Sequence, residues 1–262
     1  MPLYSELIAG LKRGTHGRVE ATVPEDWMQG RTTYGGLTAA LCLESALELI
    51  PDMPVRAAQI AFIGPVGGEV VISPAVLRRG KSSAFVNADM VTEEGIMARC
   101  IFTFGAKRAS KLDQRSRECP EVKGPDACPS FFGTGRRPTF ANHFNVRLAA
   151  GQPPMSGAAH GDMTLWLRHK DEGALWNPTT LLSIADSPPP AAMSMMREPA
   201  PISSMTWMAE FLTDHITTSE GWFLAHHEAQ ATKDGYSSQS MRLWNASGEP
   251  VMIGRQTIAV FG

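Results

Sequence analysis

The sequence predicts an α+β fold in which two similar units follow one another, and three observations support this prediction. One pattern occurs twice, at residues 78–105 and 233–262: a Gly-x-Ser-Ser start, an alternating run, a turn with Glu and Gly, and a closing Phe-Gly. A strongly apolar segment at residues 37–50 precedes the first copy. The length of 262 residues fits one large domain or two small ones.

Each copy of the repeat is expected to form a β-hairpin. The segments TEEG (92–95) and NASGEP (245–250) are rich in residues that form turns. On either side of both turns lie β-branched and aromatic residues, which strands favour. Duplication of one unit explains the shared ends and the similar lengths better than chance does.

The first unit is assigned to residues 1–105 and is expected to contain a long buried helix. In residues 37–50 the few polar side chains form a narrow stripe, so most of the helix surface should be buried. Pro51 ends this helix. About four strands are expected to follow, at residues 55–63 and 69–77 and in the two arms of the first hairpin.

The second unit is assigned to residues 139–262 and repeats this order. Residues 163–169 indicate a strand, and residues 179–186 begin a helix, since Pro178 is tolerated just before it. The remaining strands are expected at residues 204–212, 222–230, 237–244 and 251–261. A helix wrapped by a curved antiparallel sheet, occurring twice, is the arrangement of a double hotdog.

Residues 106–138 are expected to link the two units. They contain eight basic and four acidic residues, a net charge of +4 in a chain whose net charge is −2. A solvated connector is the preferred interpretation of this segment, and contact with an anionic ligand is the alternative. Cys119 and Cys128 lie within it and are interpreted as incidental.

Composition disfavours several classes of function. A net charge of −2 gives no basic field over the whole molecule, so nucleic acid is not the expected partner. No run of about 18 apolar residues occurs, and the first residues lack the apolar stretch of a signal peptide. We therefore expect no membrane span and a cytoplasmic location. The four cysteines fit no zinc pattern, so no metal is expected.

Common catalytic motifs are not found in the sequence. There is no Gly-x-Ser-x-Gly nucleophile elbow, no Walker A loop and no Gly-x-Gly-x-x-Gly loop. His226 and His227 are adjacent on an expected strand, so their side chains should point to opposite faces and should not share a metal ion. Cys42 and Cys100 are interpreted as small buried hydrophobic residues.

Three polar residues stand within apolar surroundings and are the candidates for function. Asp186 ends TTLLSIAD, Thr206 lies in SMTWMAEFL, and Gln256 lies in VMIGRQTIAVF. Each also has an ordinary structural explanation. Asp186 could cap a turn, Thr206 is a usual strand residue, and Gln256 could face solvent.

Over nearly its whole length the sequence resembles the acyl-CoA thioesterase II family, whose members are double-hotdog thioesterases. Two departures stand out, because Leu37 occupies the position of a family glutamine and Thr206-Trp207 occupy that of an Asp-His pair. The matching positions are YGGL (34–37), FIGPV (62–66), RRGKS (78–82), LSIADSPPP (182–190), Gly235, Gly248 and Gln256.

The resemblance implies hydrolysis of acyl-CoA to a free acid and CoA by residues of the second unit. Asp186 is then the base that activates water, and Gln256 and a hydroxyl group hold that water. The hydroxyl is Thr206 or Ser204, depending on the alignment, and equal strand parity would let both face the site. Backbone N–H groups at the start of a nearby helix or turn would bind the oxyanion.

The resemblance also suggests how the substrate binds. Gly35 and Gly36 are expected to contact it. The phosphates of CoA are expected to meet Arg78 and Arg79, with Lys81 or the basic residues of the linker as alternatives. No cofactor is implied besides the acyl-CoA substrate. Members of this family commonly assemble further, so a homodimer or homotetramer is expected.

Two other functions stay open on the sequence. A hotdog hydratase or dehydratase usually requires an Asp/His pair, and no histidine lies near Asp186 in the chain. A non-catalytic acyl-CoA or lipid-binding protein of the same fold is the second alternative. The missing Asp-His pair near Thr206 supports it.

Overall fold

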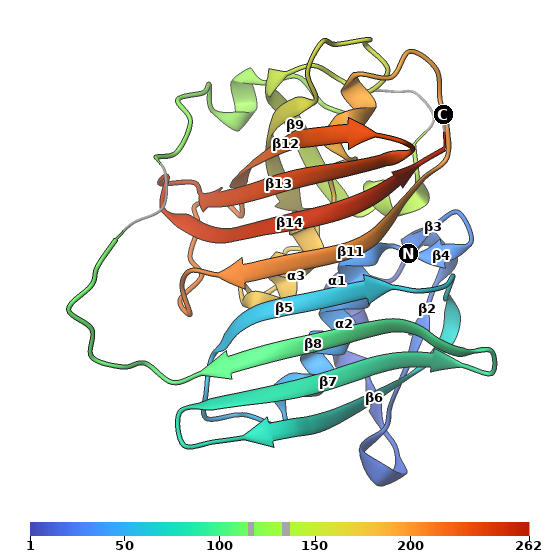
Figure 1. The fold of residues 1–262 in the computed structure, drawn as a ribbon, viewed down its shortest axis with the longest axis vertical. Helices are drawn as coiled ribbons and strands as arrows, with labels where there is room; N and C mark the ends of the chain where they lie inside the picture. Colours follow the sequence, from blue (N-terminus) through green and yellow to red (C-terminus); the bar gives the residue numbers. More distant parts are fainter. Residues whose placement is uncertain (115–117, 133–136, 262) are drawn as a thin grey trace.

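The computed structural model describes residues 1–114, 118–132 and 137–261 of the chain. Most of its strands form one long antiparallel sheet with the helices packed behind it, and two short strands pair separately with each other (Figure 1). The order of the twelve strands in this sheet is β1-β2-β6-β7-β8-β5-β11-β14-β13-β12-β10-β9. Strands β5 and β11 pair in the centre and join the two halves of the chain. The predicted α+β double hotdog is confirmed.

The N-terminal half contains the predicted helix and strands and several short elements that were not expected. Its helix α2 begins two residues earlier than predicted and ends before Glu48. Helix α1 and strands β1 and β2 were not predicted, because each is short. The elements are α1 (Tyr4–Ala9), β1 (Lys12–Arg13), η1 (Thr15–Gly17), β2 (Val19–Val23), η2 (Glu25–Trp27), β3 (Met28–Gln29), β4 (Thr32–Thr33), α2 (Gly35–Leu47), β5 (Val55–Phe62), β6 (Gly68–Arg79), β7 (Ser83–Thr92) and β8 (Gly95–Gly105).

The C-terminal half repeats the order of a helix followed by strands. Asn177 caps its helix α3 by accepting a 2.8 Å hydrogen bond from the Thr180 backbone N–H, with Pro178 in the first turn. Strand β9 was not predicted. The elements from the linker onward are η3 (Pro125–Ala127), η4 (Thr139–His143), β9 (Phe144–Gly151), β10 (Asp162–His169), α3 (Pro178–Ala185), η5 (Ala191–Ser194), β11 (Ile202–Phe211), β12 (Phe223–Lys233), β13 (Tyr236–Asn245) and β14 (Pro250–Val260).

One row of directly paired residues crosses six strands on the face of the sheet that is covered by the helices. Every member is at most 4 % exposed. The half of the row from the N-terminal unit is apolar, whereas the other half carries two glutamine side chains. From β7 to β13 the members are Ala88, Cys100, Ile60, Trp207, Gln256 and Gln239. Gln256 therefore does not face solvent.

The segment 106–138 is only partly the solvated connector that was expected. Cys128 is 6 % exposed and packs with Trp166, Trp222 and Leu224 of the C-terminal half. The Trp166 indole N–H donates a 2.8 Å hydrogen bond to the Lys123 carbonyl. Cys119 also packs against this cluster, so neither cysteine of the segment is incidental to packing. Arg115, Arg117 and Arg136 lie outside the described residues.

Candidate functional site

The end of helix α3 meets the start of helix α2, and two glycines permit this approach. A Cβ atom on Gly36 would lie 2.8 Å from the Ser183 carbonyl oxygen and 2.6 Å from the Tyr34 hydroxyl oxygen. A Cβ atom on Gly35 would lie 2.7 Å from Oδ2 of Asp186. A side chain on Gly36 would push the two helices apart, and one on Gly35 would collide with the Asp186 carboxylate. The glycines therefore place the Asp186 carboxylate beside the first turn of α2.

The structure brings together Asp186 and Gln256, which are 70 residues apart in sequence. The Gln256 side-chain Nε2 donates a 2.6 Å hydrogen bond to Oδ1 of Asp186. Burial raises the pKa of Asp186 to about 7, while the Gln256 hydrogen bond and the Gly36 backbone N–H lower it by less. Asp186 nevertheless keeps partial solvent exposure. The arrangement gives a carboxylate that can exchange protons with water near neutral pH.

A second glutamine, which the sequence analysis did not single out, continues this contact. Gln239 pairs directly with Gln256 across β13 and β14, and its Nε2 donates a 2.7 Å hydrogen bond to Oε1 of Gln256. The Gln239 Oε1 accepts a 2.9 Å hydrogen bond from the Ala191 backbone N–H. The sequence signal for Gln239 is its place among inward-facing positions of β13, whose next members are Met241 and Leu243.

Tyr34, which precedes α2, also joins the two helices. Its hydroxyl donates a 2.8 Å hydrogen bond to the Ser183 carbonyl, and its ring stacks on Phe140 with centroids 4.2 Å apart. Burial, and to a lesser degree the nearby Asp186 charge, raise the pKa of Tyr34 well above its ordinary value. Tyr34 is therefore a neutral hydrogen-bond donor that ties α2 to α3, and it does not titrate with Asp186.

The structure separates the two hydroxyl candidates. The register of β11 shifts between Ser204 and Thr206, so that Ser204 pairs with buried Ile258 while Thr206 pairs with exposed Thr257. The expectation that Ser204 and Thr206 face the same side of the sheet is wrong. A β-bulge inserts one extra residue, so the side chains that follow it point to the opposite face. Thr206 is exposed on the outer face of the sheet, away from the face that carries Gln256. Ser204 is half-buried on the face of Gln256.

The two candidate arginines do not meet Asp186. Arg79 donates hydrogen bonds of 2.7 Å to both carboxylate oxygens of Asp52 and one of 3.5 Å to the Leu49 carbonyl. Both partners follow the C-terminal end of α2, whereas Asp186 lies at its N-terminal end. A 13-residue helix is about 20 Å long, which separates Arg78 and Arg79 from the carboxylate.

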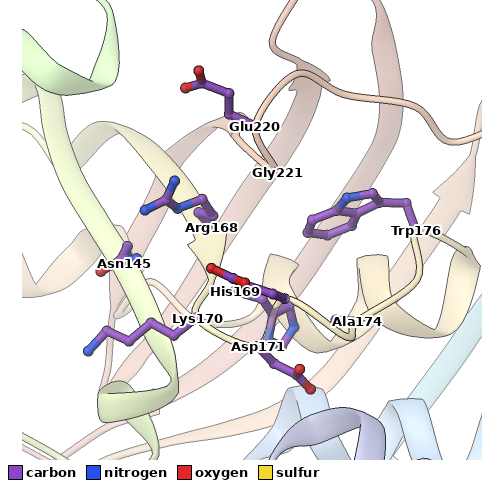
Figure 2. Close-up of a pocket in the computed structure, with 10 residues that line it drawn as sticks. Asn145, Arg168, His169, Lys170, Asp171, Ala174, Trp176, Glu220 and Gly221 are labelled. Atoms are coloured by element: carbon purple, nitrogen blue, oxygen red, sulfur yellow. The ribbon is translucent and has the colours of Figure 1, made fainter.

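A polar cleft of about 690 Å³ lies near the start of α3 (Figure 2). In Figure 2 the Trp176 ring lies on one side of it, and Arg168 and Lys170 lie on the other. Burial lowers the pKa of His169, which also lines the cleft, to about 3, and its Nε2 lies 3.1 Å from the Ser183 hydroxyl. Asp186 is not part of the lining, so this cleft is separate from the Asp186–Gln256 contact.

The histidine pair on β12 is held by packing. His227 is 1 % exposed, and the half-buried His226 ring Nδ1 lies 3.0 Å from the Thr164 hydroxyl. Burial lowers the pKa of both imidazoles, that of His227 to about 3. Cys42 and Cys100 are fully buried, as expected of small hydrophobic residues. In the part of the chain that the structure describes, no helix is long and apolar enough to cross a membrane.

Comparison with known families gives two matches that lie side by side along the chain. The model of the acyl-CoA thioesterase N-terminal domain matches residues 23–105. The model of the acyl-CoA thioesterase C-terminal domain matches residues 117–260, which is more than half of the chain. No curated protein matches the sequence significantly.

Solved structures share this fold over their full length. A hot dog-fold protein of unknown function from Alicyclobacillus acidocaldarius has a TM-score of 0.87 and 20 % identity, covering 100 % of this chain and 99 % of that one. A putative thioesterase II from Thermobifida fusca YX has a TM-score of 0.84 and 16 % identity over 100 % and 99 % of the two chains. An acyl-CoA thioesterase II from Mycobacterium marinum has a TM-score of 0.78 and 17 % identity over 98 % of each chain.

Proposed function

The chain belongs to the acyl-CoA thioesterase family, and from this premise we propose that Asp186 is the base that activates water for hydrolysis of the acyl-CoA thioester. The observation that carries the proposal is the 2.6 Å hydrogen bond between Gln256 and a partly exposed Asp186 beside the first turn of α2. The products are the free carboxylic acid and CoA.

The pKa of Asp186 suits this role. A general base works best when its pKa lies near the working pH, and such a base contributes about 10²–10⁴-fold to the rate. With a pKa of about 7, a large fraction of Asp186 is ionised at neutral pH, yet it binds a proton far more strongly than an ordinary aspartate. The leaving thiolate needs little acid assistance, because an ordinary thiol has a pKa near 8.5.

Gln256 and Ser204 are assigned to the water. Gln256 occupies Oδ1 of Asp186, so Oδ2, which faces Gly35, is the oxygen for the water molecule. Ser204 is the diagonal neighbour of Gln256 on the same face of the sheet, since it pairs with Ile258. The backbones of diagonal neighbours are about 7–8 Å apart, so their side chains can approach one another and can share a water molecule. Ser204 therefore replaces Thr206 in the proposed set.

The start of α2 is the proposed oxyanion site. The first N–H groups of a helix have no partner within the helix, and they point at whatever lies beyond its N-terminus. The Gly36 N–H already bonds the Asp186 carboxylate, so the Gly35 N–H is the proposed oxyanion donor, and neither glycine has a side chain that would block the approach of a thioester carbonyl. Loss of one oxyanion donor typically costs about 2.7–4 kcal/mol of transition-state stabilisation.

Hydration or dehydration fits the site less well than hydrolysis. Those reactions add or remove a hydroxyl group and a proton, and in hotdog enzymes they usually use an Asp/His pair. The groups that contact the Asp186 carboxylate are the Gln256 amide and the Gly36 N–H, neither of which titrates. Tyr34 is held neutral. Asp186 is thus a single titrating group, as activation of water requires.

The test is thiol release from acyl-CoAs of C2 to C18, phenylacetyl-CoA and benzoyl-CoA. Asp186→Asn should lower kcat by about 10²–10⁴-fold with the fold retained. Asp89→Asn is the matched control, because Asp89 pairs with Arg99 at 2.7 Å on strand β7, away from the site, and it should leave turnover unchanged. Full turnover by Asp186→Asn would refute the proposed base. Saturable binding of acyl-CoA by the wild type without CoA release would favour the non-catalytic binding protein.

A further inference from the structure

We propose that Gln239 is a positioning residue that fixes the side-chain amide of Gln256, so that Nε2 rather than Oε1 of Gln256 faces Asp186. This inference rests on the proposed role of Asp186 as the base. It concerns a residue that contacts neither the carboxylate nor the water directly. Its effect is transmitted through a single hydrogen bond, from Gln239 Nε2 to Gln256 Oε1, of 2.7 Å.

The direction of the hydrogen bonds follows from one backbone group. The Ala191 backbone N–H can only donate a hydrogen bond. The Gln239 side chain must therefore place its oxygen, Oε1, against this N–H, at 2.9 Å. Gln239 must then present its NH₂ group to Gln256. Gln256 must in turn present its oxygen to Gln239 and its NH₂ group to Asp186. The backbone N–H cannot turn over, whereas each amide side chain by itself could.

The burial of the pair shows why orientation matters here. Gln239 is 1 % exposed and Gln256 is 4 % exposed, so water does not compensate for an amide that points the wrong way. A reversed Gln256 would set its carbonyl oxygen against the Asp186 carboxylate. Hydrogen bonds to the charged form lower the pKa of a carboxyl group, and a facing oxygen removes that contribution. The Asp186 pKa would rise and less of the base would be ionised at neutral pH.

The same row of the sheet supports a role beyond packing. In the N-terminal half the corresponding neighbours are Ala88 and Cys100, both fully buried and apolar. Such a pair fills the space between strands without any buried amide. A buried polar group that loses its partner costs about 1–3 kcal/mol, so two buried amides are a hazard to stability. In this row the amides stand in the half that carries Asp186 and not in the N-terminal half, which fits a role in directing a hydrogen bond to the carboxylate.

The hydrogen bond from the Ala191 N–H to Gln239 is the anchor of the two amides, and two variants, the anchor variants, remove it from its donor and its acceptor side. Ala191→Pro deletes the N–H at the first position of η5, where proline is tolerated, and Pro190 before it already has the extended backbone that precedes proline. Gln239→Met keeps the length of the side chain but makes neither hydrogen bond. Thr15→Pro is the matched control, since it places proline at the first position of η1, after the extended Gly14 and between β1 and β2 at the far edge of the sheet.

The readout is the pH dependence of kcat and kcat/KM with one acyl-CoA that the wild type turns over. Both anchor variants should lower kcat at pH 7 by about 5-fold while KM changes by less than about 3-fold. The acidic limb of their kcat profiles should move to higher pH by about one unit, because less of the base is ionised. Activity should recover at alkaline pH, which a merely structural loss would not do. Thr15→Pro should match the wild type.

The result that overturns the proposal is an unshifted acidic limb in the anchor variants together with a large loss of turnover in Asp186→Asn. In that case the proposed base stands and the positioning role fails. Retained turnover in Asp186→Asn overturns both. If Ala191→Pro does not fold, the limb of Gln239→Met decides alone, since this substitution leaves the backbone intact.

Discussion

The two halves of the molecule share one architecture but differ in a single row of buried residues. On the N-terminal side the row carries Ala88, Cys100 and Ile60, and on the C-terminal side it carries Trp207, Gln256 and Gln239. The helices differ in the same way. The ninth residue after the N-cap is Leu43 in α2 and Asp186 in α3.

The starts of the two helices show the reverse asymmetry. The second residue of α2 is Gly36, whose backbone N–H bonds the Asp186 carboxylate. The second residue of α3 is Thr179, whose hydroxyl donates a 3.0 Å hydrogen bond to Oε2 of Glu44 on α2. The reciprocal contact is therefore closed by a side-chain pair. The difference teaches that the two halves join unequally: at one junction the start of α2 from the first half meets the acid and amides of the second, and this junction is the site that we propose.

Asp186→Asn sharpens the comparison of the two helices, because it gives α3 an uncharged side chain at the position where α2 has Leu43. A pKa of about 7 instead of 3.8 means that the folded state holds a proton which the unfolded state has released. Wild-type stability should therefore fall as pH rises from about 4 to about 7, by on the order of 2–4 kcal/mol. The variant should lack this fall and be the more stable protein at pH 8. Urea denaturation at both pH values measures it, and a wild-type stability that does not change with pH would contradict a buried carboxylate.

The close contact between the start of α2 and the end of α3 can be disrupted by Gly36→Ala. The added methyl group would stand within 2.8 Å of the Ser183 carbonyl, which forces the helices apart. The expected loss of stability is about 1–3 kcal/mol, together with a fall in kcat/KM. Gly124→Ala is the control, because a Cβ atom there meets nothing within 4 Å. Equal melting temperatures of the two variants would show that the close approach is not needed.

The smallest expected effect is the difference between removing the Ser204 hydroxyl and removing the Thr206 hydroxyl, which lie on either side of the bulge in β11. Ser204→Ala should lower kcat by about 10-fold, because it removes one hydrogen bond to the water, and a hydrogen bond of about 1.4 kcal/mol corresponds to tenfold. Thr206→Val should leave kcat within about 2-fold of wild type, because Thr206 lies on the outer face with Thr257. The reverse order of effects would return Thr206 to the site and require a different register of β11.

The sequence by itself determined the repeated units, both hairpins and the two residues that meet at the site. The reason is that these features are local. An alternating run with a turn predicts a hairpin from adjacent residues, and Asp186 and Gln256 stand out because their own neighbours are apolar. The resemblance to the thioesterase II family then implied that the two act together.

Only the tertiary structure decided which candidate hydroxyl shares the face of Gln256, which glutamine contacts Gln256 and which helix start lies beside Asp186. The bulge after Ser204 reverses the side of the strand that follows, and local alternation does not reveal it. Gln239 meets Gln256 because of the register between β13 and β14, and Gly36 meets Asp186 because two helices far apart in the sequence pack end to start. Each of these contacts depends on how distant segments are aligned, which is a property of the whole sheet and core.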